Sequence, residues 1–126
     1  VTEFVSAVPI IPARDVAAAA EWYRDQLEYD VVHIEPEYGI VRRGESSIHF
    51  WGPSGIAPEA SNTMIRVGVR GIDDLYAEYS GRGIVHPNDP LTTKPWNLRE
   101  FSVGDRDGNL VTFFEPPAGG VAGGEG

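Results

Sequence analysis

Two side chains capable of metal chemistry stand near the ends of short aromatic segments, His49 in SSIHFWG and Glu115 in NLVTFFEP. Divalent metals bind firmly where several nitrogen and oxygen donors converge, whereas a lone carboxylate holds them weakly. The chain has no cysteine, which excludes disulfides, zinc–thiolate centres and thiol nucleophiles. Two alternatives therefore stay open, a metal-dependent enzyme that uses His49 and Glu115, and a metal-free binding protein.

Strand alternation sorts the residues of SSIHFWG into a core face and an open face. Ile48 and Phe50 suit the core beneath a helix, which leaves His49 and Trp51 on the open face. In a binding protein, this imidazole and indole would contact the ligand.

The segment LREFSV follows the same rule. Phe101 and Val103 suit the core, so we expect Leu98, Glu100 and Ser102 on the opposite face. Glu100 would then present its carboxylate to a ligand.

Two more aromatic residues are expected at the rim of this face. Trp96 lies in a proline-containing loop before LREFSV, and Tyr38 begins a strand beside a glycine. Aromatic rings mixed with carboxylates suit a flat, positively charged small molecule. Glu115 could balance such a charge, or it could lie in solvent or pair with an arginine such as Arg66.

Composition limits the classes of function. A chain of 126 residues is about one domain, and its net charge of −9 argues against binding to a nucleic-acid backbone. There is no apolar run of about twenty residues, so no membrane span is expected. The first residues contain an acid and soon two prolines rather than a signal peptide, which favours a cytoplasmic location.

The first half of the chain shows one helix and four strands. Ser6 to Ala13 suits an edge strand because of its prolines, and Asp15 is a natural N-cap for a helix through VAAAAEWYRDQL. The segments DVVHIEP, YGIVRRG and SSIHFWG are expected to form three short strands.

The second half repeats this order. The strand TMIRVGVRG precedes a helix that ends at Gly81 or Gly83, and three strands follow, IVHPND, LREFSVGD and NLVTFFEP. The pattern is βαβββ twice, which predicts an α+β fold. Residues 53–61 are the expected linker between the modules, and residues 118–126 are an expected flexible, glycine-rich tail.

Three segments, PARDVAAAAEWYRDQL, VRGIDDLYAEY and above all PWNLREFSVGDRDGN, resemble those of the vicinal-oxygen-chelate superfamily, also called the glyoxalase/bleomycin-resistance superfamily. The resemblance implies a single domain over residues 1–117, in which modules at about 1–52 and 62–117 curl a mixed sheet around a cavity. Two positions depart from the family pattern: Asn97 replaces a usual glycine, and Arg106 replaces a usual proline.

The resemblance also identifies the positions where enzymes of this superfamily hold a metal. These positions fall on Val8, on Met64, on Glu115 and near His49 or Trp51. Val8 has no donor, and a thioether is a poor ligand for such metals. We therefore expect no metal and no cofactor, with His49 and Glu115 as the weaker metal-binding alternative.

Within the superfamily the chain is most similar to bleomycin-resistance proteins, which sequester antibiotics without modifying them. The resemblance implies a homodimer whose N-terminal strands are exchanged near Pro9, with two crevices that bind a cationic, partly aromatic antibiotic. Tyr38 and Trp96 would stack on planar rings of the ligand. The full expected ligand-binding set is Tyr38, His49, Trp51, Met64, Arg66, Trp96, Leu98, Glu100 and Glu115. The alternatives are a metal-dependent lyase, isomerase, dioxygenase or thiol transferase, and a binder of another natural product such as an enediyne or mitomycin.

Overall fold

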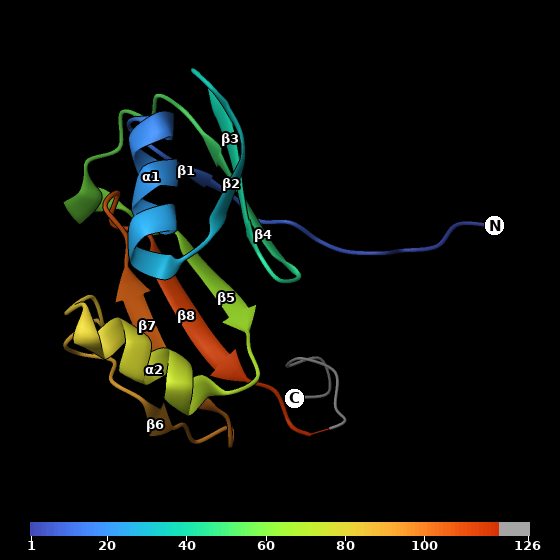
Figure 1. The fold of residues 1–126 in the computed structure, drawn as a ribbon, viewed down its shortest axis with the longest axis vertical. Helices are drawn as coiled ribbons and strands as arrows, with labels where there is room; N and C mark the ends of the chain where they lie inside the picture. Colours follow the sequence, from blue (N-terminus) through green and yellow to red (C-terminus); the bar gives the residue numbers. More distant parts are fainter. Residues whose placement is uncertain (119–126) are drawn as a thin grey trace. The chain divides into compact units, whose positions relative to one another are not determined.

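The computed structural model describes residues 1–118, which form two compact units. The first unit ends at Ile56 and the second begins at Ala57, inside the segment expected to be a linker. Each unit has one α-helix and one four-stranded sheet, so the α+β fold with two βαβββ modules is confirmed (Figure 1). The segment predicted to be a flexible tail, 118–126, lies outside the described residues except for its first position.

The sheet of the first unit has the strand order β1-β4-β3-β2. β1 runs parallel to β4, and the other neighbours are antiparallel. Its elements are β1 (Ile10–Pro12), α1 (Val16–Leu27), β2 (Asp30–Glu35), β3 (Tyr38–Arg43) and β4 (Ser46–Trp51). As predicted, the proline-containing first strand lies at a sheet edge, where a missing backbone N–H is tolerated.

Helix α1 forms as its sequence pattern predicts. The Asp15 side chain accepts a hydrogen bond from the backbone N–H of Ala18 at 3.0 Å, which caps the first turn. Buried residues recur at helical spacing, and Tyr23 packs edge-on against Phe50 of β4 with ring centroids 5.0 Å apart. The face of the sheet that carries Phe50 is therefore the core face, and the face that carries His49 points away from the helix.

The residues before β1 have little protein around them. Phe4 is 96% exposed and Val5 is 82% exposed, and the segment extends away from the sheet of its own unit (Figure 1). Leaving large apolar side chains in water is energetically unfavourable. The composition of this segment is therefore typical of a strand that would pack against further protein, which its own unit does not supply.

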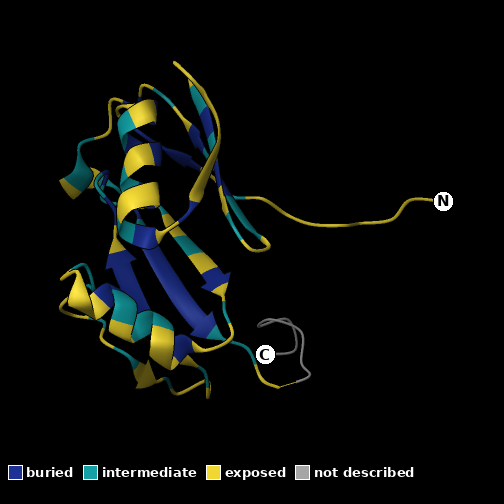
Figure 2. Cartoon of the chain, in the orientation of Figure 1, coloured by how far each residue is buried: buried dark blue, intermediate teal, exposed yellow. Residues whose placement is uncertain are grey.

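The sheet of the second unit has the order β5-β8-β7-β6, with β5 parallel to β8. Its elements are a short 3₁₀ helix η1 (Pro58–Ala60), β5 (Met64–Gly68), α2 (Ile72–Gly81), β6 (Thr92–Thr93), β7 (Arg99–Gly104) and β8 (Leu110–Glu115). Strands β7 and β8 are buried over most of their length (Figure 2).

An aromatic cluster forms the core between α2 and this sheet. The rings of Phe101 and Phe113 stack with centroids 5.5 Å apart, and Tyr79 of α2 packs against Phe113 at 5.4 Å. All three side chains are 1% exposed or less. This packing fixes β7 and β8 so that Glu100, Ser102 and the other alternate residues project from the face opposite α2.

The prediction that IVHPND forms a strand was wrong. The segment makes one isolated bridge, between Val85 and Val103, and the fourth strand of the sheet is Thr92–Thr93 instead. Pro87 and Pro90 have no N–H to donate to a ladder, and Asp89 has both its main chain and its side chain bonded to Ser102. The segment therefore runs across the sheet as a loop.

The DRDGN turn between β7 and β8 is held by side-chain bonds. Oδ1 of Asp105 accepts from the backbone N–H groups of Asp107 at 2.8 Å and Asn109 at 2.9 Å. Gly108 has φ of +78°, and an added Cβ would lie 2.0 Å from the carbonyl oxygen of Pro58. Glycine is required there by both conformation and space.

No helix within residues 1–118 is long and apolar enough to cross a membrane.

Candidate functional site

Glu115, at the end of β8, caps helix α2. Its Oε1 accepts hydrogen bonds from the backbone N–H of Gly71 at 2.8 Å and of Ile72 at 3.0 Å. The N-cap residue of α2 is Gly71, with φ of +79°, and it has no side chain that could perform this role. A carboxylate from the last strand therefore satisfies donors that a helix leaves unpaired at its start.

The electrostatics of Glu115 agree with this role. The hydrogen bond from the Ile72 N–H lowers the pKa of Glu115 below its usual value. The Gly71 N–H and the positive charges of Arg70 and Arg99 act in the same direction. Desolvation raises the pKa, but its effect is smaller than that of the Ile72 bond. A negative charge at a helix N-terminus is favourable because it complements the helix dipole. One of the two carboxylate oxygens of Glu115, Oε1, is thus bonded to the protein backbone.

Arg66 of β5 pairs with Glu100, so the pair with Glu115, one of the alternatives left open by the sequence, does not form. Nη1 of Arg66 donates to Oε1 of Glu100 at 3.2 Å, and Nη2 donates to Oε2 at 2.6 Å. The guanidinium also lies over the ring of Phe114, with its central carbon 4.5 Å from the ring centroid. The pair joins two strands that are not neighbours, β5 and β7, across β8.

Glu100 occupies the predicted face but not the predicted environment. Its register partner on β8 is Phe114, so it projects opposite Phe101 as strand alternation requires. Its side chain is only 3% exposed, whereas that of Arg66 is 47% exposed. Burial by itself raises the pKa of Glu100, but the hydrogen bonds from Arg66 and Trp96 outweigh burial and lower the pKa overall.

Trp96 lies at the surface, as predicted, in a tight turn before β7. It is 59% exposed, yet its Nε1–H donates to Oε2 of Glu100 at 2.7 Å. The turn is closed by a hydrogen bond from the Lys94 N–H to the Leu98 carbonyl at 2.9 Å. Asn97 has φ of +68°, so it takes the left-handed conformation for which glycine is usual and which asparagine tolerates better than most residues. Asn97 therefore adopts the left-handed turn conformation without being a glycine.

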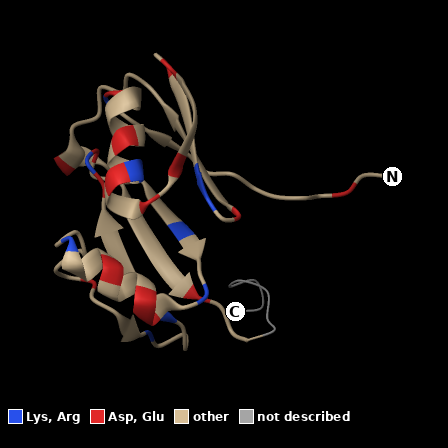
Figure 3. Ribbon diagram, viewed as in Figure 1, with Lys and Arg blue, Asp and Glu red and all other residues tan. Residues whose placement is uncertain are grey.

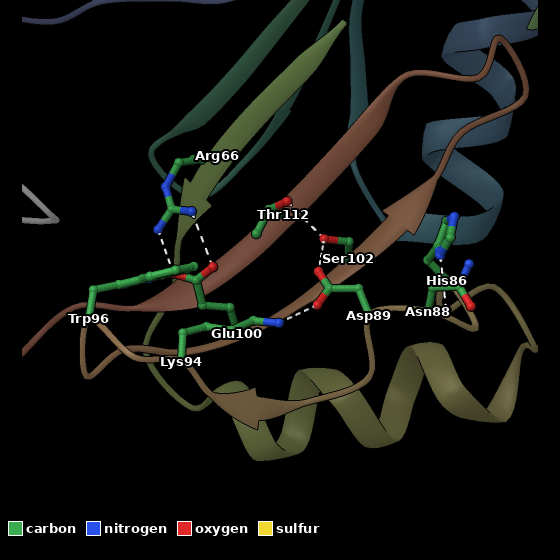
Figure 4. Close-up of polar contacts among 9 residues, drawn as sticks. All are labelled: Arg66, His86, Asn88, Asp89, Lys94, Trp96, Glu100, Ser102 and Thr112. Carbon is green, nitrogen blue, oxygen red and sulfur yellow. Dashed lines mark hydrogen bonds and ion pairs between the residues drawn. The ribbon is translucent and has the colours of Figure 1, made fainter. Parts of the chain in front are cut away.

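A second polar network lies under the same loop, and sequence reasoning missed it (Figure 4). The carboxylate of Asp89 accepts from Nζ of Lys94 and from the hydroxyl of Ser102, which is itself 2.8 Å from Oγ1 of Thr112. Partial burial raises the pKa of Asp89, but the bonds from Lys94 and Ser102 outweigh burial and lower it overall. Lys94 therefore ties the loop that carries Trp96 to the sheet.

The loop explains why Ser102 and Glu100 are buried although they face away from α2. Residues 89–98 cross this face, and Asp89, Lys94 and Trp96 cover the polar groups of β7 (Figure 4). Glu100 and Ser102 therefore lie on the predicted face but are buried beneath this loop, while Leu98 is half-buried. A short-range alternation rule cannot show that a distant loop returns to cover a strand.

The first unit has a smaller aromatic cluster on the face opposite α1. The hydroxyl of Tyr38 lies 2.6 Å from Nδ1 of His49, and the two rings are edge-to-face at 5.4 Å. Trp51, directly opposite Tyr38 in the β3–β4 ladder, is 45% exposed. The predicted trio Tyr38, His49 and Trp51 is therefore brought together.

The positions tied by resemblance to metal binding do not gather donors. Val8 is 40% exposed and Met64 is 68% exposed, and neither has an oxygen or nitrogen to offer from its side chain. Within residues 1–118, no group of three or more His, Cys, Asp or Glu side chains is placed to hold a metal ion. Both helices carry acidic residues (Figure 3), of which Glu21, Asp25, Asp73 and Asp74 are exposed.

Comparison with known proteins establishes the family. The family model described as the Glyoxalase/Bleomycin resistance protein/Dioxygenase superfamily matches residues 5–113. The chain belongs to this superfamily. The expectation from the three sequence segments is thereby confirmed.

The relatives include proteins named for bleomycin. A bleomycin resistance protein from Geobacillus stearothermophilus is 30% identical over 127 residues, covering 88% of this chain and 96% of the relative. A bleomycin-binding protein from Streptomyces verticillus, solved with copper(II)-bleomycin, is 29% identical with a TM-score of 0.76, covering 90% of this chain and 97% of that one. A bleomycin resistance determinant encoded on transposon Tn5 has the same fold, with a TM-score of 0.78 at 22% identity and coverage of 89% and 98%.

Proposed function

We propose that this protein confers resistance by sequestration: it binds a bleomycin-type or related DNA-damaging natural product without covalent bonds and without modifying it. The similarity to bleomycin resistance and bleomycin-binding proteins extends over nearly the whole length of both chains, which supports this function more than a shared fold does.

The observation that carries the proposal is that Trp96 is exposed to solvent and yet held in place by hydrogen bonds. This indole is 59% exposed, yet a buried carboxylate fixes its N–H and a hydrogen-bonded turn fixes its backbone. An exposed tryptophan that serves no binding role gains little from such fixation. A ring held ready for stacking loses little freedom when a planar ligand binds, which favours affinity.

The groups that an enzyme of this superfamily would use are engaged in structural roles here. Glu115 caps α2, and His49 is bonded to Tyr38. Sequestration requires neither a base nor a metal. It requires a dissociation constant well below the toxin concentration and protein in excess of toxin, because protection then follows from mass action.

The proposal keeps the homodimer with exchanged N-terminal strands, and two features support it. The segment before β1 exposes Phe4 and Val5 almost completely, and β1 occupies an edge of its sheet. A second copy of the chain would bury these side chains. Strand exchange around Pro9 is the form in which the segment would do so.

The test is native mass spectrometry of the protein mixed with bleomycin, with an enediyne and mitomycin in separate samples. We expect two unmodified drug molecules per dimer and no bound divalent ion. Covalently altered drug would contradict sequestration. A stoichiometric metal ion that is lost on His49→Ala or Glu115→Ala would do so as well, in favour of a metal-dependent enzyme.

Trp96 variants extend this test to the site itself. Loss of the ring in Trp96→Ala is expected to weaken drug binding by about 1–2 kcal/mol, measured by calorimetry. Trp96→Phe keeps a ring but loses the bond to Glu100, so an intermediate loss is expected. Trp22→Phe, on helix α1, is the control that leaves affinity unchanged.

A further inference from the structure

The Arg66–Glu100–Trp96 cluster of the second unit has an unusual division between buried and exposed groups. The Glu100 side chain at its centre is 3% exposed, while the Arg66 side chain and the Trp96 residue that it holds are 47% and 59% exposed. A ligand arriving at this cluster would meet a cation and an aromatic ring, not the acid that binds them (Figure 4).

The geometry leaves part of the guanidinium available. Glu100 takes one N–H from each of the two terminal nitrogens of Arg66. A guanidinium has five N–H donors in a fixed plane, so Nε–H and the outer N–H of each terminal nitrogen remain. Within residues 1–118 no hydrogen bond to these remaining donors is found, and Phe114, whose ring centroid lies 4.5 Å from the central carbon of the guanidinium, offers no acceptor from its side chain.

The indole and the guanidinium are also adjacent. Nε1 of Trp96 and Nη2 of Arg66 both bond to the same oxygen, Oε2 of Glu100, at 2.7 and 2.6 Å. A planar molecule stacked on Trp96 would therefore have Arg66 beside it, where a substituent on its ring could meet the free donors. An acceptor oxygen at that substituent would complete the donor set of Arg66.

Charge decides which kind of oxygen fits. Arg66 is positive and Glu100 is negative, so together they present no net charge, and the whole chain carries −9. A carboxylate on the ligand would gain from Arg66 but would also meet the repulsion of Glu100, from the far edge of the guanidinium, and of a chain with a net charge of −9. A neutral carbonyl oxygen accepts the same hydrogen bonds without that repulsion.

From this cluster we infer that Arg66 is a specificity-determining residue, which selects planar aromatic ligands that carry a carboxamide or ketone oxygen beside the ring stacked on Trp96. The inference rests on the proposed function for the presence of a stacked ligand. The sequence predicted that Glu100 presents its carboxylate to the ligand. In this inference Glu100 instead positions Arg66 and Trp96 and does not bind a ligand cation.

The experiment uses three small probes that share one ring: quinoline, quinoline-2-carboxamide and quinoline-2-carboxylate. Each is titrated into the full-length protein and followed by the ¹H–¹⁵N signal of the Trp96 indole, assigned by its loss in Trp96→Phe. We expect the carboxamide to bind about fivefold to tenfold more tightly than quinoline, because it adds a hydrogen bond to a charged, half-exposed donor. We expect the carboxylate to bind no better than the carboxamide.

Two variants test the residues behind this preference. Arg66→Lys keeps the charge opposite Glu100 but loses the planar fork, so the advantage of the carboxamide over quinoline should fall to about twofold or less. Glu100→Gln keeps the shape of the side chain and removes its charge, so the carboxylate should now bind more tightly than the carboxamide. Arg99→Lys is the matched control, since Arg99 is also 47% exposed and paired with a carboxylate, Asp73, but has no tryptophan in its pair.

Equal binding of the three probes to the wild type would overturn the inference, as would a carboxamide preference that survives Arg66→Lys. Failure of all probes to shift the Trp96 signal would overturn it too. The proposed function fails separately: a protein that shows the carboxamide preference but binds no antibiotic stoichiometrically has the Arg66 site without sequestration. A protein that binds antibiotic but lacks the preference sequesters by other contacts.

Discussion

Replacing Glu115 separates its two possible roles, helix cap and metal ligand. In Glu115→Ala the N–H groups of Gly71 and Ile72 lose their acceptor, and water replaces it. Loss of an N-cap side chain typically costs about 0.5–2 kcal/mol, and the half-exposed position, with Asp73 and Asp74 still in the first turn, places the expected loss near 1 kcal/mol. For a domain of this size such a loss lowers Tm by about 3–5 °C.

The assay is urea unfolding followed by circular dichroism, with EDTA and with added divalent ions. Glu115→Gln retains an oxygen acceptor without the charge, so we expect a loss of about half that of Glu115→Ala. Glu45→Ala removes an exposed acid in the β3–β4 turn and is the charge-matched control, with an expected change within about 0.5 kcal/mol.

Two results would refute the reasoning. One is a Glu115→Ala protein as stable as Glu45→Ala, which would show that the bonds to α2 contribute nothing. The other is a saturable stabilisation of the wild type by a divalent ion that disappears in Glu115→Ala, which would identify the carboxylate as a ligand.

Three further predictions concern stability and are checked by the same unfolding assay. Asp15→Ala removes the cap on Ala18 and should cost about 1 kcal/mol, with Asp15→Asn close to the wild type. Gly108→Ala forces a Cβ against the Pro58 carbonyl at positive φ and should cost about 2 kcal/mol or more; a change below the Asp15→Ala value would contradict the described turn. The lowered pKa of Glu100 means that its contribution to stability is present above the pKa of the unfolded chain, about 4.3, and is lost as pH falls through the lower folded value. The wild type should therefore lose stability below about pH 4.5 more steeply than Glu100→Gln, and parallel pH profiles would exclude this role.

The elements that depend on local pattern could be predicted from the sequence. Helix α1 has its apolar residues at regular spacing and an aspartate at its N-cap, so its bounds followed from a few residues. The faces of β4 and β7 also followed, because strand alternation has a fixed period. These are properties of neighbouring residues.

The misassigned features depend on residues far apart in the chain. The burial of Glu100 follows from a loop that returns over β7, and the role of Glu115 follows from a helix that begins 43 residues earlier, after a glycine N-cap. Nothing in the spacing of Asp89 and Lys94 indicates that they bond to each other and that Asp89 bonds to Ser102. A signal was present in Gly71, since a helix that begins with glycine and no capping side chain requires an acceptor from elsewhere.

The two units start their helices by different means, and this difference bears on the order of folding. In α1 the cap comes from Asp15, three residues before the N–H that it accepts, so the first turn can close within its own segment. In α2 the cap comes from the end of β8, so the first turn gains its acceptor only after the sheet of that unit has assembled. Local contacts form with little loop-closure entropy, whereas distant ones must wait for the intervening chain to be ordered. One repeated architecture thus contains a helix able to nucleate early and a helix whose start is coupled to the last strand.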